Sequence, residues 1–324
     1  MKSLAAVLVP SLLILLATAY AGHLRSLGAR EMALGLPAIF LLLGAYFAFA
    51  RADFVRLVSG FVADSRTRLL LTAQAFLLPY LVYAFPLGCF SLAGFLKLAL
   101  YVNLPLLVLI GAGARGQVSW REGAALLLIW LPLELRWLGP LWPWPPGQPG
   151  YFLFGILGVS LAVFLFVVQR GMGDVGYTFV VRRRDAALAT LAFLIFAPIA
   201  LAFGLATGFL HPIHRLPAAL PCAGKVLAIF LATGVPEELL FRGLLQNLLG
   251  RWTGRPWLSV GLAAILFGGA HLNNGGSPDW RYLLLATAAG TVYGTVYRLG
   301  GTLMAPALAH TLVDSTWALF FRGR

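Results

Sequence analysis

Residues 224–249 read GKVLAIFLATGVPEELLFRGLLQNLL. A membrane-spanning helix needs about 20 mainly apolar residues, because each residue rises about 1.5 Å through a hydrocarbon core about 30 Å thick. This run is long enough to cross that core. Its polar exceptions after Lys225 are Thr233, Glu237, Glu238, Arg242, Gln246 and Asn247. The stretch therefore predicts a membrane helix that carries ionisable side chains.

The apolar character extends over the whole chain. Of 324 residues, 60% are hydrophobic and 11% are charged, with a mean hydropathy of +0.87. Soluble domains carry about 25% charged residues, so this composition excludes a soluble globular protein. The net charge is +13, but the basic residues lie between apolar runs. We therefore interpret them as topology signals and contacts to membrane lipid, and expect no nucleic-acid binding.

Apolar runs of spanning length predict an all-α, polytopic membrane helical bundle of about eleven transmembrane helices, with about eight as the lower count. The expected spans are 3–21, 32–50, 69–90, 94–113, 122–138, 151–169, 186–208, 224–249, 257–272, 281–298 and 302–320. Cys89 and Cys222 form no CxxC motif. They predict neither a disulfide framework nor a thiolate metal site.

Basic residues predict the orientation of the chain. Segment 51–68 carries Arg51, Arg56, Arg66 and Arg68, and segment 170–185 carries Arg170, Arg182, Arg183 and Arg184. If the spans alternate, both segments lie on the side of Lys2, which predicts a cytoplasmic N-terminus in the cell (inner) membrane. Residues 1–21 also fit a cleaved signal peptide, but a retained first helix is favoured.

The stretch LWPWPPGQPGY, residues 141–151, divides the chain. Its prolines cannot continue a helix, and its tryptophans suit a membrane interface. Residues 1–150 contain almost no candidate catalytic group, and we expect N-terminal membrane helices of unassigned role there. Residues 170–320 contain nearly all such groups, and we expect them to form the functional domain.

Glu237 and Glu238 lie within a predicted span. An ionisable group at the centre of a membrane costs at least about 2.5–3.5 kcal/mol, so it is a functional candidate by default. On a helix, Glu238 and Arg242 share a face and can pair, while Glu237 points about 100° away. Pro236 predicts a local break or a new first turn just before the acids. The alternative is an ordinary ion pair at a water-exposed helix end.

A histidine closes the apolar run of LFGGAHLNN, residues 266–274. Gly268 and Gly269 should let another helix approach closely. Taken alone, His271 at a helix end also fits an interfacial, hydrogen-bonded residue.

A second histidine lies in APALAHTLVDS, residues 305–315. His310 and Asp314 are four residues apart on one helical face, where the aspartate can orient the imidazole or both can ligate a metal. Taken alone, they also fit a self-satisfied polar pair. Because polar groups in lipid seek partners, we expect these histidines and the glutamates to converge in one cavity.

A carboxylate with two imidazoles in a wet pocket suits the activation of water. A desolvated glutamate is a usable general base, and a histidine can hold the same water or donate to a developing oxyanion. Peptide hydrolysis follows naturally as the reaction. Zinc is the alternative: Glu237, His271 and His310 make a two-histidine, one-carboxylate ligand set, although the chain lacks an HExxH motif. Residue types alone leave both mechanisms open.

Three motifs in this order resemble a known family. EELLFR at 237–242, FGGAH at 267–271 and HTLVD at 310–314 resemble the motifs EExxxR, FxxxH and HxxxN/B of the CPBP family of intramembrane proteases. That family includes the Rce1-like CAAX prenyl endopeptidases and bacterial bacteriocin-processing and immunity proteins. The resemblance covers about 170–320 and extends to DVGYTFVVRRRD at 174–185. It implies a helical membrane fold and a water activated by glutamate and histidine, in a family that is often described as metalloproteases.

The resemblance also implies a role for each matching residue. Glu237 would be the general base, Glu238 with Arg242 a supporting pair, His271 a second water-holding group and His310 the oxyanion-side group. Asp314 stands where the family often has asparagine, which adds a charge at that corner. The implied partners are membrane lipid and a peptide or membrane-protein substrate, which is prenylated in the CAAX branch.

Two other classes of protein use similar residues. An ion-coupled transporter also relays protons through membrane carboxylates and histidines. A non-catalytic immunity or scaffold membrane protein can retain a protease fold. The order of the three motifs favours an intramembrane endopeptidase, because no transport requirement explains it.

Overall fold

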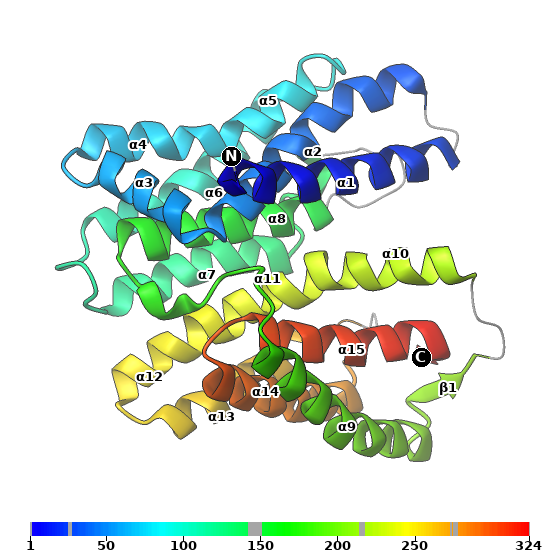
Figure 1. Ribbon diagram of the computed structural model, residues 1–324. Coiled ribbons are helices and arrows are strands. Elements are labelled where there is room, and N and C mark those ends of the chain that lie inside the picture. Colours follow the sequence, from blue (N-terminus) through cyan, green and yellow to red (C-terminus); the bar gives the residue numbers. More distant parts are fainter. Residues whose placement is uncertain are drawn as a thin grey trace. The chain divides into compact units, whose positions relative to one another are not determined.

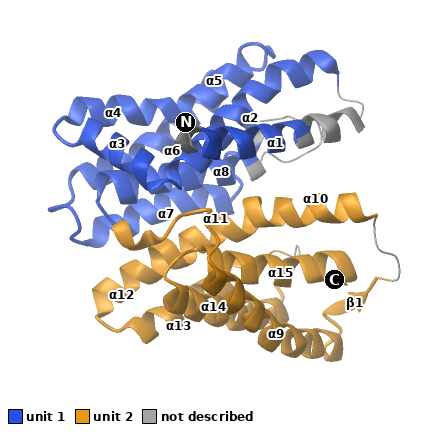
Figure 2. Cartoon of the chain, in the orientation of Figure 1, with its two compact units in different colours: residues 1–172 blue, residues 173–324 orange. Residues whose placement is uncertain are grey.

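The structure is a computed structural model that describes residues 2–24, 28–141, 151–213, 218–272, 274 and 278–323. The regular elements of the described chain are helices, apart from two short strands (Figure 1). It divides into two compact units, Met1–Met172 and Gly173–Arg324 (Figure 2). The predicted all-α helical bundle is confirmed. Residues 142–150 of the predicted Trp- and Pro-rich boundary lie outside the described residues.

The first unit consists of helices joined by short connections. They are α1 (Lys2–Leu24), α2 (Ala29–Phe49), α3 (Ala52–Val62), α4 (Arg66–Gln74), η1 (Ala75–Leu77), α5 (Leu78–Ala84), α6 (Leu92–Ile110), α7 (Trp120–Glu134), η2 (Gly139–Leu141), α8 (Tyr151–Val163) and the π-helical η3 (Phe164–Gln169).

The second unit contains the remaining helices and one two-stranded ladder. Its elements are η4 (Gly173–Val175), α9 (Arg183–Ala206), β1 (Leu210–Pro212), α10 (Ala219–Ile229), η5 (Phe230–Gly234), α11 (Val235–Glu238), η6 (Leu239–Gln246), α12 (Asn247–Thr253), α13 (Pro256–Ala270), α14 (Trp280–Gly300), α15 (Met304–Phe320) and β2 (Phe321–Gly323). Strands β1 and β2 pair antiparallel, with Leu210 opposite Gly323. The sequence analysis did not predict this ladder.

Every predicted span contains helix, and several helices have the length of a membrane crossing. Within the described residues, five helical stretches are long and apolar enough to cross: Ala29–Phe49, Arg66–Ala84, Leu92–Ile110, Arg183–Ala206 and Ala219–Thr253. Shorter apolar helices cover Ala5–Leu16, Leu153–Gln169 and Pro256–Ala270. Such lengths and compositions are those of an integral membrane protein. The inner membrane and the cytoplasmic N-terminus stay predictions.

Two basic segments differ from the loops that the sequence analysis expected. Segment 51–68 contains the helix α3, because its apolar residues recur with helical period. Arg170 is no surface charge, since it is 4% exposed. Its Nε donates to Glu122 Oε1 at 2.7 Å, and its Nη1 donates to the carbonyl of Gly113 at 2.8 Å. Arg170 therefore fastens the loop before α7.

Helix ends in the second unit are fixed by local sequence. Asp279 caps α14 by accepting from the backbone N–H of Arg281 at 2.9 Å. Gly254 and Gly301 end α12 and α14 with φ of 64° and 73°, a conformation that suits glycine. These stops set the lengths of the helices that hold the candidate site.

Candidate active site

One continuous helical run, Ala219–Thr253, carries both glutamates. Glu237 and Glu238 lie on the single α-helical turn α11, between the π-helical stretches η5 and η6. Pro236 stands in the first turn of α11, just before the acids, as the second of the two expected alternatives has it, and the helical run continues through it. π-Helical turns are rare and frequently mark functional sites. Here they flank the two acids on both sides.

Glu238 and Arg242 form the predicted ion pair, and it is buried. Arg242 Nη1 donates to Glu238 Oε1 at 3.0 Å, and the two side chains are 1% and 0% exposed. Arg242 Nη2 donates to the carbonyl of Gly290 on α14 at 3.2 Å. The guanidinium also lies 4.4 Å from the centre of the Phe267 ring. The pair is therefore inside the protein, and not at a water-exposed helix end.

His310 on α15 contacts the same carboxylate. Its Nδ1 lies 2.8 Å from Glu238 Oε1. Because a carboxylate oxygen accepts, Nδ1 carries the proton and donates, which leaves Nε2 facing away from Glu238. One oxygen of Glu238 thus serves both Arg242 and His310. This link between α11 and α15 was not predicted from the sequence.

His271 is fixed in the same tautomer by a different partner. It is the C-terminal capping residue of α13, and its Nδ1 lies 2.7 Å from the carbonyl oxygen of Phe267. A carbonyl can only accept, so Nδ1 donates and the neutral ring presents an Nε2 lone pair. Phe267, four residues before His271, therefore acts through its backbone carbonyl.

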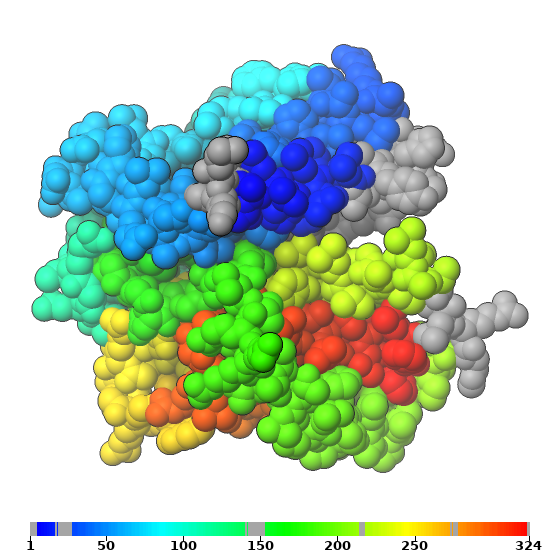
Figure 3. Space-filling view, in the orientation of Figure 1, coloured from blue at the N-terminus to red at the C-terminus, as the bar shows by residue number. Residues whose placement is uncertain are grey.

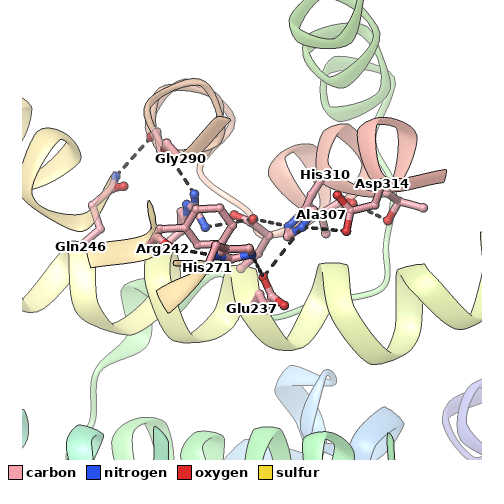
Figure 4. A network of polar contacts seen from close by, with 12 residues as sticks. Glu237, Arg242, Gln246, His271, Gly290, Ala307, His310 and Asp314 are labelled. Atoms are coloured by element: carbon pink, nitrogen blue, oxygen red, sulfur yellow. Dashed lines mark hydrogen bonds and ion pairs between the residues drawn. The ribbon is translucent and has the colours of Figure 1, made fainter. Parts of the chain in front are cut away.

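Glu237 is the meeting point of the two rings (Figure 4). Its Oε2 lies 3.8 Å from His271 Nε2 and 3.8 Å from His310 Nε2. That oxygen is buried and has no hydrogen-bond partner in the described part of the chain. The side chain as a whole is 22% exposed. The carboxylate is thus reachable at one edge and faces two imidazole nitrogens at the other.

Asp314 lies beside His310 on α15, as its spacing predicts. Its Oδ2 is 3.4 Å from His310 Nε2, and its side chain is 34% exposed. Asp314 reaches Nε2 while Glu238 holds Nδ1 more closely, so the expected orienting role of Asp314 stays a prediction. Asp314 places a second carboxylate on the open side of the ring.

Glycines let the helices approach closely enough for these contacts. A Cβ at Gly268 would lie 2.8 Å from the carbonyl oxygen of Leu283 on α14, and one at Gly234 would lie 3.1 Å from that of Ala307 on α15. The sequence predicted such a role for Gly268 and Gly269. The structure confirms it for Gly268 only, since nothing lies within 4 Å of a Cβ at Gly269.

Two tyrosines of α14 complete the surroundings, and the sequence analysis missed both. The Tyr293 ring stacks on His310 with centroids 4.8 Å apart, and the Tyr282 ring lies 5.3 Å from His271. The two tyrosines are eleven residues apart, which is about three turns and places them on one helical face. That spacing was the available signal, but an uncharged tyrosine in an apolar helix does not stand out.

An apolar pocket adjoins the two histidines. It encloses about 640 Å³ of empty space, open solvent included, and its lining comes mainly from α9, α14 and α15. His271, His310 and Asp314 supply charged or ionisable groups to its wall, while alanine, leucine and aromatic residues form most of the rest. The pocket therefore places an apolar surface directly beside the polar cluster.

The donor distances test the zinc alternative. Tetrahedral zinc with bonds of about 2.0–2.2 Å holds neighbouring ligand atoms about 3.4 Å apart. Glu237 Oε2 lies 3.8 Å from each histidine Nε2. Over the described ranges, no three His, Cys, Asp or Glu side chains are placed to hold a metal ion together. The donor atoms therefore lie somewhat farther apart than the ligands of a tetrahedral zinc ion.

The part of the chain that carries this cluster matches a known protein family. Residues 219–316 match the family described as type II CAAX prenyl endopeptidase Rce1-like. The matched segment contains the six residues Glu237, Glu238, Arg242, His271, His310 and Asp314. The resemblance to the CPBP and CAAX protease family is confirmed for this segment.

A curated relative covers the same part of the chain. An uncharacterized protein, YpbD of Bacillus subtilis (strain 168), is 29% identical over 97 residues. The match spans 30% of this chain and 46% of that protein, which is less than half of the relative's length. No solved structure matches the chain.

Proposed function

We propose that the protein is an intramembrane endopeptidase in which Glu237 activates a water molecule. One observation supports this most strongly: a carboxylate oxygen of Glu237 that has no hydrogen-bond partner among the described residues faces the Nε2 atoms of two histidines. Separations of 3.8 Å are too long for direct hydrogen bonds but suit a small polar molecule between the groups. The Rce1-like match adds support from an independent source.

The reaction follows from the positions of these donors and acceptors. Glu237 takes a proton from water, and the oxygen of that water attacks the carbonyl carbon of the peptide bond. The tetrahedral intermediate then collapses as Glu237 returns the proton to the leaving nitrogen. The products are a carboxylic acid and an amine, so atoms and charges balance.

The two histidines are suited to different tasks. His271 is held by a neutral carbonyl, so its Nε2 can accept a hydrogen bond from the attacking water. His310 has carboxylate oxygens at both nitrogens, Glu238 at 2.8 Å and Asp314 at 3.4 Å. Its ring can therefore carry a proton on each nitrogen and donate to the oxyanion. Tyr293, stacked on that ring, holds its plane.

The apolar pocket supports a substrate with an apolar portion near the scissile bond. Alanine, leucine and aromatic side chains line it beside His271 and His310. The name of the matched family denotes prenylated substrates, and we include a prenylated peptide among the candidates. A peptide segment of a membrane protein is the other candidate.

Cleavage in labelled water tests the proposal. The purified protein in lipid nanodiscs would be mixed with farnesylated and unmodified peptides in H₂¹⁸O, and the products analysed by mass spectrometry. We expect one ¹⁸O in the new carboxyl group of a cleaved peptide, and at least a 100-fold loss of rate in Glu237→Gln. Glu31→Gln, which changes an exposed glutamate of the first unit, should cleave normally. Cleavage by Glu237→Gln at the normal rate would rule out Glu237 as the base.

A further inference from the structure

Helix α3 is too short to cross a membrane, yet it lies between two stretches that are long enough. Its eleven residues extend about 16 Å. The candidate span Ala29–Phe49 ends three residues before α3 begins, and the candidate span Arg66–Ala84 begins four residues after it ends. Connections this short leave α3 at the level where both spans meet the membrane surface. A helix at that level is in contact with headgroups.

Only part of the apolar face of α3 packs against the rest of its unit. Phe54 packs edge-on against Phe49 of α2 at 5.2 Å, and Val62 is buried. At the edge of the same face, Leu57 and Phe61 are 70% and 53% exposed. They are four residues apart and so form one stripe along the helix. This stripe is apolar surface that its own unit does not cover.

The segment that carries the stripe is rich in arginine. Segment 51–68 carries four arginines against two aspartates, Asp53 and Asp64. Arg51 pairs with Asp53 at 2.8 Å. The other three, Arg56, Arg66 and Arg68, are exposed, and no ion pair to an acid is found for them among the described residues. The segment appears at the surface of its unit in Figure 3, in mid-blue.

One contact joins the charges to the stripe. The guanidinium carbon of Arg68 lies 5.4 Å from the centre of the Phe61 ring. A cation held over the edge of an apolar stripe is the arrangement of an interfacial helix, whose apolar residues enter the acyl boundary while its basic residues meet phosphate. The opposite side of the helix, with Arg56 and Gly60, is polar or small. Helix α3 thus has an apolar face for the acyl region and a basic face for the headgroups of a membrane.

We propose that α3 is an interfacial helix that binds anionic phospholipid. Leu57 and Phe61 enter the acyl boundary, and Arg56, Arg66 and Arg68 contact headgroup phosphates. This surface is separate from the residues of the candidate active site, so the proposal does not rest on peptidase activity.

Spin labels at single cysteines test where α3 lies. In a Cys89→Ala/Cys222→Ala background, Leu57→Cys and Arg56→Cys would each be labelled in nanodiscs that contain phosphatidylglycerol. We expect the label at position 57 to collide with oxygen and the label at position 56 to collide with water-soluble nickel chelate. Equal nickel access at both positions would overturn the proposal. A label at 57 shielded from both reagents would also overturn it, because protein would then cover the stripe.

Lipid counting tests the headgroup specificity with the native cysteines in place. Native mass spectrometry would count phosphatidylglycerol and phosphatidylcholine retained from mixed nanodiscs. Each arginine near a membrane surface strengthens anionic lipid binding about fivefold, so Arg56→Gln/Arg66→Gln/Arg68→Gln should lower the retained phosphatidylglycerol but not phosphatidylcholine. Arg30→Gln, an exposed arginine at the far end of α2, is the control. Unchanged phosphatidylglycerol in the triple variant would refute the headgroup contacts.

Discussion

A single carboxylate oxygen organises the candidate site at the scale of residues. Glu238 Oε1 accepts from Arg242 Nη1 at 3.0 Å and from His310 Nδ1 at 2.8 Å. It thereby joins a neighbour on its own helical run to a ring on α15. Because Glu238 is fully buried, removal of either donor leaves its carboxylate less well neutralised in a surrounding of low dielectric constant. Glu237, one residue earlier, keeps an oxygen available for a ligand.

Removal of the arginine should therefore destabilise the protein strongly. Arg242→Ala leaves Glu238 without its cationic partner inside the protein. Breaking a buried ion pair by removing one partner costs about 3–5 kcal/mol. We expect a loss of this size in the free energy of unfolding, measured by denaturant titration in detergent.

A surface pair supplies the control for that measurement. Arg51 and Asp53 form an ion pair with side chains 28% and 43% exposed. Such pairs contribute about 0–1 kcal/mol, so Arg51→Ala should unfold close to the normal midpoint. If Arg242→Ala proved no less stable than Arg51→Ala, Glu238 would have to be in contact with water.

Metal content is the second prediction at this scale. We expect full activity with far less than one zinc per chain, and no loss on chelation, because the donors lie farther apart than zinc ligands. Elemental analysis of the purified protein and activity before and after chelation would measure this. One equivalent of zinc that disappears in both His271→Ala and His310→Ala would reverse the expectation, and Glu237 would then act beside a metal.

The candidate site residues were easier to predict from the sequence than the contacts between them. Ionisable groups in apolar runs were visible one by one, and the spacing of Glu238 and Arg242 predicted their pair. The link from Glu238 to His310 was not predictable, since 72 residues separate them and no local pattern relates them. Which nitrogen of each ring carries a proton also depends on such distant or backbone partners. The catalytic roles themselves stay predictions.

At the scale of elements, the close packing of α13 on α14 positions His271. The ring belongs to the residue that caps α13, so any separation of these helices moves its Nε2. Gly268 lies at the contact, where the carbonyl of Leu283 leaves no room for a side chain. Gly269, its neighbour, faces open space.

These adjacent glycines offer a matched pair of substitutions. Gly268→Ala would bring its Cβ within 2.8 Å of Leu283 O, and overpacking of this kind costs about 1–3 kcal/mol. We expect lower thermal stability and lower cleavage activity. Gly269→Ala meets no atom and should be neutral or stabilising by up to about 1 kcal/mol. Melting curves that rank the two variants in the opposite order would contradict this packing.

Long helices were predictable because an apolar run of spanning length leaves few alternatives. Short or irregular elements were not. Helix α3 was hidden because its arginines make segment 51–68 look like a polar loop, although its apolar residues keep helical period. The π-helical stretches η5 and η6 depend on one-residue shifts of backbone hydrogen bonds, and residue types do not encode these shifts plainly.

At the scale of the whole molecule, each compact unit has its own buried ion pair. Arg170 and Glu122 pair within Met1–Met172, and Arg242 and Glu238 pair within Gly173–Arg324. If the units unfold independently, damage to one pair should stay in its own unit. Arg170→Met should therefore speed amide hydrogen exchange within residues 1–172, and Arg242→Ala within residues 173–324.

Hydrogen exchange with mass spectrometry would map both variants against the unaltered protein. Peptides from the undisturbed unit act as the internal control in each case. Faster exchange across both units in both variants would show one cooperative structure and would contradict the division.

Synthesis of the chain brings Glu238 and Arg242 into the membrane together. They are four residues apart on one helical run, so the acid meets its cationic neighbour as soon as that turn forms. His310 is made 72 residues later. Of the two groups that contact Glu238 Oε1, Arg242 is therefore the one present from the start to offset the cost of placing the acid in hydrocarbon. We expect the arginine to support insertion of this helix and the histidine to join when α15 packs against it.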